Sequence, residues 1–205
     1  MTRRLLVASR SRHKVAELHD LLDLGDDVSL VSPDDVGIDG EPVEDADSFE
    51  GNAEIKVRYY AERSGLPTLA DDSGLEVDAL DGGPGVQTKR YAGPAATDED
   101  NNSKLLAEMA GLAPAERGAR YQCVLAFWDP QRGGEPVFRS GAFEGRIATE
   151  RRGSGGFGYD PIFEPEGEAP GGRTVGQMTS DEKHALSHRG KAARAMAEYL
   201  EGEGW

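Results

Sequence analysis

The chain has 205 residues, 37% of them hydrophobic, and a formal net charge of −15. This length and apolar content predict a buried core, and we expect residues 1–205 to form a single domain. The acidic balance argues against a nucleic-acid partner, because nucleic-acid binding depends on Lys and Arg to neutralise phosphates. An acidic protein that binds an anionic small molecule has to concentrate positive charge locally or use a metal ion.

The chain has one cysteine, Cys123, and it lies in an apolar run. A single cysteine excludes a disulfide framework and a thiolate metal site, and we expect it to be a core residue. The apolar run 5–8 is too short for a signal peptide, and no run reaches membrane-spanning length. We therefore expect a cytoplasmic protein without a membrane partner.

Apolar periodicity predicts helices and strands that alternate in the first half of the chain and longer strands that follow later. We expect strands over 3–8, 28–31, 66–70, 75–80, 119–128 and 135–147, and helices over 15–24, 48–64, 97–109 and 187–201. Asp47, Thr97 and Ser187 are the expected helix caps. The pattern predicts an α/β protein with a mixed sheet.

Two adjacent carboxylates, Asp71 and Asp72, follow a short apolar run and precede Ser73 and Gly74. Like charges raise each other's pKa, so a divalent cation would make such a pair less costly. The alternative interpretation is a solvated turn, because Asp, Ser and Gly are ordinary turn residues. Glu44, in an acidic loop, would complete a Mg²⁺ site with Asp72 if the two met in the fold.

The segment between the first strand and the first helix is basic and lies where backbone amides and the helix dipole favour an anion. It lacks the glycines of a Walker A loop, and its Lys14 is the candidate phosphate contact. The segment reads Ser9, Arg10, Ser11, Arg12, His13 and Lys14.

Two later segments carry candidate base-binding groups. Phe157 and Tyr159 flank Gly158 and could present a stacking surface, and Asp160 could accept hydrogen bonds from the N–H groups of a base. Lys183, His188 and Arg189 supply donors that suit a carbonyl oxygen or a phosphate.

The ordered set of segments resembles the inosine triphosphate pyrophosphatase family, the Ham1-like nucleotidases. The resemblance spans nearly the whole chain. Besides the opening loop with Lys14, it rests on segments 48–53 (Ser-Phe-Glu-Gly-Asn-Ala), 70–75 (Ala-Asp-Asp-Ser-Gly-Leu), 83–85 (Gly-Pro-Gly), 90–93 (Arg-Tyr-Ala-Gly), 155–161 (Gly-Gly-Phe-Gly-Tyr-Asp-Pro) and 182–190 (Glu-Lys-His-Ala-Leu-Ser-His-Arg-Gly).

The resemblance implies a hydrolase of nucleotide metabolism that converts ITP, dITP and XTP to the monophosphate and pyrophosphate. It implies Mg²⁺ as cofactor, a homodimer, and an elongated α/β fold with a mixed sheet flanked by helices and a nucleotide cleft between two lobes. It assigns catalysis to Asp72, Asp71 and Lys14, and metal binding to Asp72 and Glu44. The implied substrate-binding residues are Ser9, Arg10, Ser11, Arg12, His13, Lys14, Ser73, Phe157, Gly158, Tyr159, Asp160, Lys183, His188 and Arg189.

The first loop departs from the family's usual Thr-Gly-Asn-x-Gly-Lys, because both glycines and the asparagine are missing. Lost glycines restrict access to positive φ, and Arg10 or Arg12 could offset lost amide contacts with charge. Two alternatives stay open. One is a Maf-like pyrophosphatase acting on modified pyrimidine nucleotides, and the other is a nucleotide-binding protein that has lost turnover.

Overall fold

The computed structural model describes residues 2–205, except for the side chains of Arg12, His13 and His184. Its contacts group the chain into two compact units. Unit 1 contains the described residues up to Asp72, with Cys123–Gly141 and Arg189–Trp205; unit 2 contains Ser73–Gln122 and Ala142–His188. The expectations of a single domain over 1–205 and of a cleft between lobes stay predictions.

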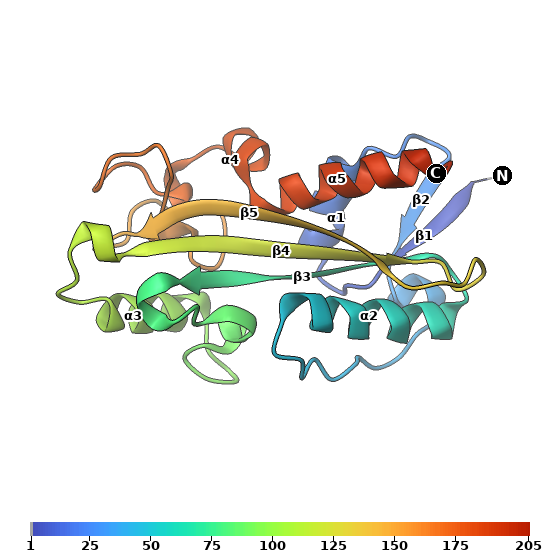
Figure 1. The fold of residues 1–205 in the computed structure, drawn as a ribbon, viewed down its shortest axis with the longest axis horizontal. Coiled ribbons are helices and arrows are strands. Elements are labelled where there is room, and N and C mark those ends of the chain that lie inside the picture. The colour runs from blue at the N-terminus through green and yellow to red at the C-terminus, as the bar shows by residue number, and fades with distance from the viewer. Residues whose placement is uncertain (1) are drawn as a thin grey trace. The chain divides into compact units, whose positions relative to one another are not determined.

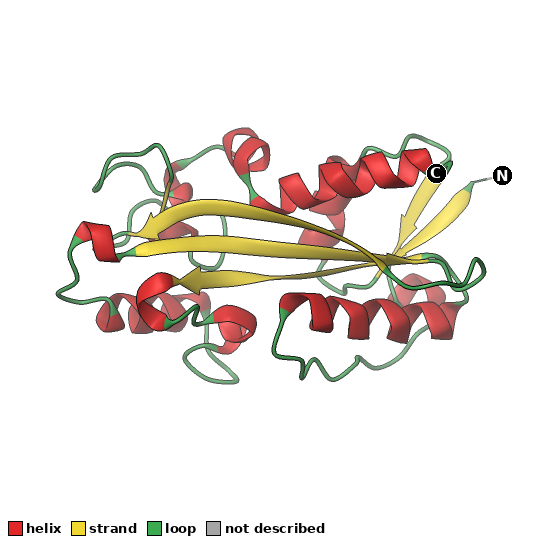
Figure 2. Cartoon of the chain, viewed as in Figure 1, coloured by secondary structure: helices red, strands yellow, loops and turns green. Residues whose placement is uncertain are grey.

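The strands form one six-stranded sheet in the order β2-β1-β3-β4-β5-β6 (Figure 1). Their bounds are β1 Arg3–Val7, β2 Val28–Val31, β3 Thr68–Val77, β4 Gly118–Trp128, β5 Val137–Ile147 and β6 Phe163–Pro165. β1 pairs in parallel with β2 and β3, whereas β5 and β6 are antiparallel. This mixture confirms the predicted fold class, and helices flank the sheet (Figure 2).

Four of the α-helices, α1 to α4, follow a residue whose side chain accepts a backbone hydrogen bond. The α-helices are α1 Arg12–Leu22, α2 Phe49–Ser64, α3 Asp98–Glu108, α4 Ser180–Leu186 and α5 His188–Gly202. The predicted capping box of Thr97 and Asp100 is confirmed. The prediction of Asp47 as the cap of α2 was wrong: Ser48 has the extended backbone of a cap, and its Oγ accepts from the Gly51 N–H.

The core of unit 1 covers both faces of its part of the sheet. Leu5 and Leu69 pack with residues of α1 and α5, while Leu6 and Ala70 pack with residues of α2. Side chains of neighbouring strand residues point to opposite faces, so each apolar run of β1 and β3 serves two helix layers.

The core of unit 2 is built around aromatic side chains. Tyr121 and Phe143 both pack against Phe163, and all three belong to the same buried cluster as Leu105 of α3. Tyr159 belongs to this cluster as well. Buried side chains therefore anchor the 3₁₀ turn Asp160–Ile162, which follows the glycine-rich loop 153–158.

β3 is longer than the sequence predicted. Two short strands with the Asp pair in a turn between them were expected, but one strand runs from Thr68 to Val77 and contains Asp71, Asp72 and Ser73. The residues Asp, Ser and Gly predicted a break in the strand because they favour turns locally. In the structure the two carboxylates stay within the strand because cationic side chains from other elements pair with them.

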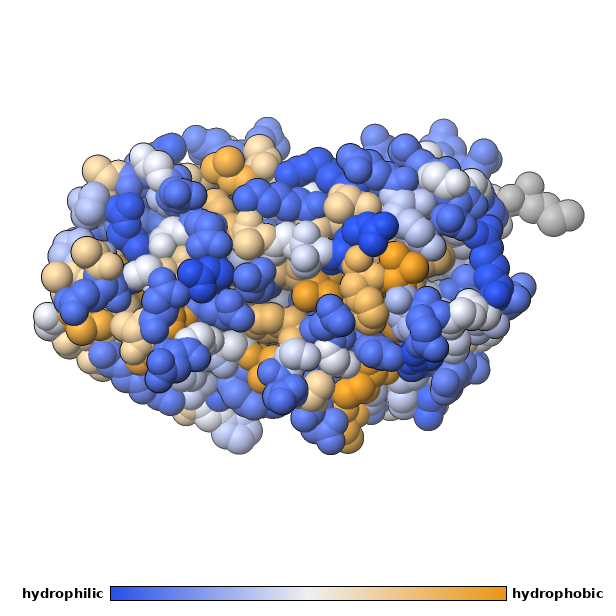
Figure 3. All heavy atoms as spheres, in the orientation of Figure 1, coloured by the Kyte–Doolittle hydropathy of each residue, from blue (hydrophilic) through white to orange (hydrophobic). Residues whose placement is uncertain are grey.

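One face of the molecule is mostly hydrophilic, with smaller apolar areas between the hydrophilic side chains (Figure 3). Across residues 2–205, no helix combines the length and the apolar character needed to cross a membrane.

Candidate functional site

Asp71 lies at the centre of a buried charge network in unit 1. Its Oδ1 accepts from the Lys14 ammonium, and its Oδ2 accepts from Arg189 Nε at 3.0 Å. The other side of the Arg189 guanidinium donates from NH1 to Glu17 at 2.7 Å. The Cys123 thiol donates to the same Asp71 Oδ2 at 3.3 Å. Two cations and two carboxylates therefore balance one another inside the unit.

The network fixes the protonation of Asp71. Burial alone would raise its pKa, but the charges of Arg189 and Lys14 outweigh burial and hold the pKa of Asp71 well below its usual range. Burial and the nearby Asp71 carboxylate raise the pKa of the Cys123 thiol, so the thiol stays protonated. An ionised carboxylate held by two cations is a poor general base.

Asp72 faces a separate set of partners. Lys56 of α2 donates from Nζ to Asp72 Oδ1 and to Glu44 Oε2, both at 2.8 Å. Burial raises the pKa of Asp72 despite the Lys56 charge, and Glu44 adds to the rise. Burial would lower the pKa of Lys56, but Asp72 and Glu44 together raise it. The predicted meeting of Glu44 with Asp72 thus occurs through a shared ammonium.

The donor set of Glu44 and Asp72 fits a hard cation. Two carboxylates with one lysine leave one formal negative charge, and Mg²⁺ is often held by one or two carboxylates together with substrate phosphates. Among the described residues, no group of three His, Cys, Asp or Glu side chains could hold a metal ion. These residues therefore suit an ion that shares its ligands with a phosphate-bearing substrate.

The first loop is arranged around a helix start. Ser11 caps α1, and its Oγ accepts from the Lys14 N–H at 3.4 Å, which puts Lys14 in the first turn. Ser9 Oγ accepts from the Ser11 N–H at 3.2 Å. The Arg10 side chain turns to the segment 34–41. The predicted contacts of the Arg12 and His13 side chains lie outside the described residues.

The aromatic pair in unit 2 is divided between surface and core. Phe157 is 40% exposed, and the Lys183 ammonium lies 4.1 Å from its ring centroid. Tyr159 is only 2% exposed, and its hydroxyl donates to the Thr88 carbonyl at 2.9 Å. Of the two predicted stacking rings, Phe157 therefore has surface to offer a ligand and Tyr159 is a core residue.

Asp160 organises this part of unit 2. Its Oδ2 accepts from the Phe157 N–H at 2.9 Å and from Lys183 Nζ at 2.6 Å, and its Oδ1 accepts from the Tyr121 hydroxyl at 3.4 Å. The carboxylate is buried, so these protein donors take the place of the predicted base N–H groups. The Gly158 N–H donates to Asp98 at 2.7 Å.

His188 and Arg189, adjacent in sequence, are both buried in their own units. His188 stacks on Tyr121 with ring centroids 4.9 Å apart and planes 10° from parallel. Arg189 belongs to the Asp71 network of unit 1. Sequence reasoning expected both to bind substrate, and the structure adds a packing role for each.

Sequence reasoning missed Lys56, Glu17 and Tyr121. The signal for Lys56 is its spacing: it follows Phe49, Asn52 and Ala53 on the buried face of α2, where an unpaired lysine is costly. Glu17 occupies the turn after Lys14, on the face of α1 that carries Leu18 and Leu22 into the core. A charged residue on an apolar helix face indicates a buried partner.

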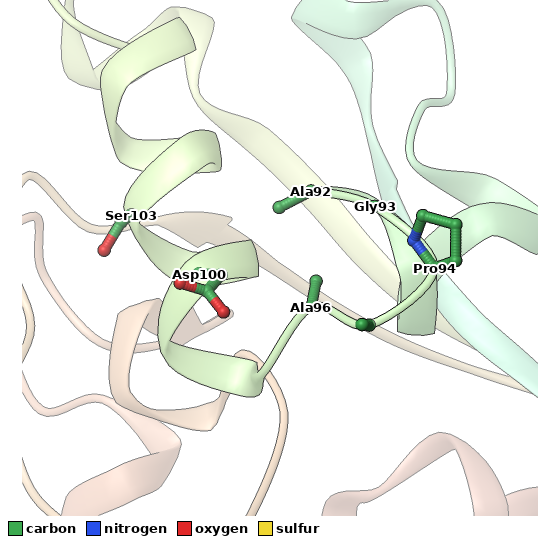
Figure 4. Close-up of a pocket in the computed structure, with 7 residues that line it drawn as sticks. Ala92, Gly93, Pro94, Ala96, Asp100 and Ser103 are labelled. Atoms are coloured by element: carbon green, nitrogen blue, oxygen red, sulfur yellow. The ribbon is translucent and has the colours of Figure 1, made fainter.

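A cavity of about 570 Å³ in unit 2 lies apart from the predicted residues (Figure 4). It is lined by Ala92, Gly93, Pro94, Ala95, Ala96, Asp100 and Ser103. Its one carboxylate, Asp100, accepts from Thr97 as part of the cap of α3. Its lining holds no cationic side chain for a phosphate, and its other polar side chain is that of Ser103.

A mixed sheet with flanking helices, carrying carboxylates paired with lysine ammonium groups, defines an α/β protein suited to an anionic substrate. The chain belongs to the Ham1 family, whose family profile matches residues 5–199. This confirms the resemblance inferred from the sequence segments.

Curated relatives include dITP/XTP pyrophosphatases. That of Methylococcus capsulatus is 46% identical over 200 residues, covering 98% of this chain and 97% of the relative. That of Corynebacterium efficiens is 46% identical over 198 residues, covering 94% and 95%.

Solved structures agree with the fold. A HAM1 protein from Coxiella burnetii is 36% identical with a TM-score of 0.89, over 98% of this chain and 100% of that chain. A nucleoside-triphosphatase / dITP/XTP pyrophosphatase from Mycobacterium abscessus is 44% identical with a TM-score of 0.78, over 94% and 98%.

Proposed function

We propose that this protein is a nucleoside triphosphate pyrophosphatase that hydrolyses dITP, XTP and ITP to the monophosphate and pyrophosphate. The observation that carries the proposal is the set of Glu44, Lys56 and Asp72 in a chain similar over nearly its full length to dITP/XTP pyrophosphatases. Such an enzyme removes non-standard purine nucleotides from the pool, and we expect it to work in the cytoplasm.

Unit 1 carries the groups that we assign to the triphosphate. Lys14, in the first turn of α1, offers its ammonium to the phosphates, where the helix dipole also favours negative charge. Asp72 is the candidate base that orients or deprotonates the attacking water, because its raised pKa makes it a better proton acceptor than Asp71. When bound, Mg²⁺ would neutralise charge on the triphosphate, with Glu44 and Asp72 as its protein ligands.

Unit 2 carries the groups that we assign to the base. The exposed ring of Phe157 can pack against a purine. Lys183 and His188 supply N–H donors, which suit the keto oxygen of hypoxanthine or xanthine. The amino group of adenine is a donor and would leave such donors unpaired, so ATP should be rejected.

The decisive experiment measures pyrophosphate released from dITP, XTP, ITP, ATP, GTP and dTTP, each with Mg²⁺ and with EDTA. We expect Mg²⁺-dependent release from the first three and little from the others. Release from dTTP alone would favour the Maf-like alternative. Binding of dITP without release would favour the non-catalytic alternative. Sedimentation of the same sample tests the homodimer that we also expect.

A further inference from the structure

The first loop of this chain differs from the family pattern at Arg10, which stands where the pattern has a glycine. A cation in a loop next to a helix start would ordinarily be assigned to the substrate phosphates. The Arg10 side chain instead contacts an acidic segment of unit 1. This contact gives the residue a different role.

Arg10 makes four contacts with residues 34–41. Its NH1 donates to the Asp34 carboxylate, and its NH2 donates to the carbonyl oxygens of Ile38 at 2.6 Å and Gly40 at 3.0 Å. Its Nε lies 3.4 Å from Glu41 Oε1. The planar fork of arginine suits such a set, because each of its nitrogens can meet a different oxygen.

The contacted segment needs a cation to hold its shape. Residues 34–47 include seven acidic residues and no basic one, so the segment repels itself. Among the described residues, Arg10 forms ion pairs near its start and Lys56 pairs with Glu44, while the charge of Arg4 acts on Asp35. With two carboxylates on its guanidinium, Arg10 has little positive charge left for a phosphate.

Arg10 also limits where Glu44 can lie. The described hydrogen bonds hold the segment at Gly40 through Arg10 and at Ala46, whose N–H donates to Asn52 Oδ1 at 3.0 Å. Glu44 lies between these two points and only four residues from Gly40, so the chain has about 14 Å of reach at most. Releasing Gly40 would leave Ala46 as the remaining backbone restraint and would weaken the contact of the Glu44 carboxylate with Lys56.

We infer that Arg10 is a positioning residue: it fastens segment 34–41 to the first loop and thereby fixes Glu44 beside Lys56 and Asp72. The inference rests on the proposed function for its catalytic consequence. Its structural part stands on the contacts of Arg10 alone. It reassigns Arg10 from the substrate-binding residues that the sequence predicted.

The test compares Arg10→Gln, Asp34→Asn and the double variant with wild type. Asp34→Asn keeps the arginine but removes one of its two carboxylate partners, the one that accepts from NH1. If Arg10 is a positioning residue, both single variants should lower kcat/KM for dITP by about tenfold. The double variant should be no worse than the more severe single, because both changes break one contact set.

A second readout needs neither metal nor nucleotide. Hydrogen–deuterium exchange of the ligand-free protein should be faster over residues 38–47 in both single variants and unchanged over α3. The matched control is Arg120→Gln. Arg120 is 30% exposed against 28% for Arg10 and contacts Glu76, Asp78 and Glu144 in unit 2. It should leave exchange over 38–47 and kcat/KM unchanged.

Two results would overturn the inference. If Asp34→Asn kept or improved the KM for dITP while Arg10→Gln raised it, Arg10 would bind phosphate directly, because loss of the competing carboxylate would free it. If exchange over 38–47 stayed at the wild-type rate in both variants, the fastening role would be absent. The exchange result decides even if no nucleotide is hydrolysed, so failure of the proposed function is separable from failure of this inference.

Discussion

Asp71 and Asp72 are neighbours in β3, yet their carboxylates bind cations from opposite faces of the sheet. Asp71 binds Lys14 of α1 and Arg189 of α5, and Asp72 binds Lys56 of α2. The alternation of side chains along a strand produces this division. One carboxylate is locked as an anion by two cations, and the other shares a single ammonium with Glu44. Under the proposed function, Asp71 is therefore the structural carboxylate of the pair and Asp72 the candidate base.

The first prediction concerns Asp72→Asn. Turnover of dITP should fall by about 10³-fold, the range of general base catalysis, while the fold is kept. The pKa of Asp72 is higher in the folded protein than in the unfolded chain. Its stabilising contribution is therefore fully present below the unfolded pKa and is lost as pH rises through the folded pKa. The variant should thus melt at the wild-type temperature or above at pH 7. Activity within tenfold of wild type would remove Asp72 from catalysis.

The second prediction concerns Asp71→Asn, which leaves Arg189 with an uncompensated buried charge. We expect a loss of about 3 kcal/mol in the free energy of unfolding at pH 7, measured with urea. The pKa of Asp71 is lower in the folded protein than in the unfolded chain, where it is about 3.9. The stabilisation by ionised Asp71 is therefore present above the unfolded pKa and is lost as pH falls through the folded pKa. The gap between wild type and variant should therefore shrink below about pH 4. A gap that stays constant down to pH 2 would contradict this.

Removal of the Lys56 charge gives the third prediction. Burial raises the pKa of Asp72, and the Lys56 ammonium opposes that rise. In Lys56→Met the pKa should rise further, so the acid limb of kcat/KM should move to higher pH. Lys104→Met is the control, because Lys104 lies over Tyr91 on the surface of α3. An acid limb that does not move would mean that Asp72 is not the titrating base.

Phe157 and Tyr159 supply the fourth prediction. Phe157→Ala should raise the KM for dITP by about tenfold, because base stacking on an aromatic ring contributes about 1–3 kcal/mol. Tyr159→Phe should keep the KM and lower stability by about 1 kcal/mol, the net value of its hydrogen bond to Thr88. The opposite pattern would make Tyr159 the stacking ring. Steady-state kinetics and urea unfolding of both variants measure these effects.

Much of the fold could be predicted from local patterns. The strand 28–31 and the helix cap at Thr97 depend on neighbouring residues, and the structure confirms both. The seven-residue α4 and three-residue β6 are too short to give a periodic signal. Their places are fixed by contacts with distant parts of unit 2.

The candidate site was only partly predictable, because its charges are balanced over long sequence distances. The Asp pair and Lys14 stand out in the sequence, but their partners Arg189 and Lys56 come from other helices. Without those partners, the local sequence left a solvated turn at Asp71 open as an alternative to a cation site. The role of Arg10 depends in the same way on Asp34 and Gly40, which no local pattern links to it.

The contact of Asp71 with Arg189 spans 118 residues and has a consequence for biosynthesis. At about 5–20 residues per second, a ribosome needs on the order of ten seconds to add the guanidinium after the carboxylate. Both segments of unit 2 are complete when Arg189 is added, whereas unit 1 still lacks α5. Unit 1 is thus completed after unit 2, and for that interval its buried anion depends on Lys14, the Cys123 thiol and water.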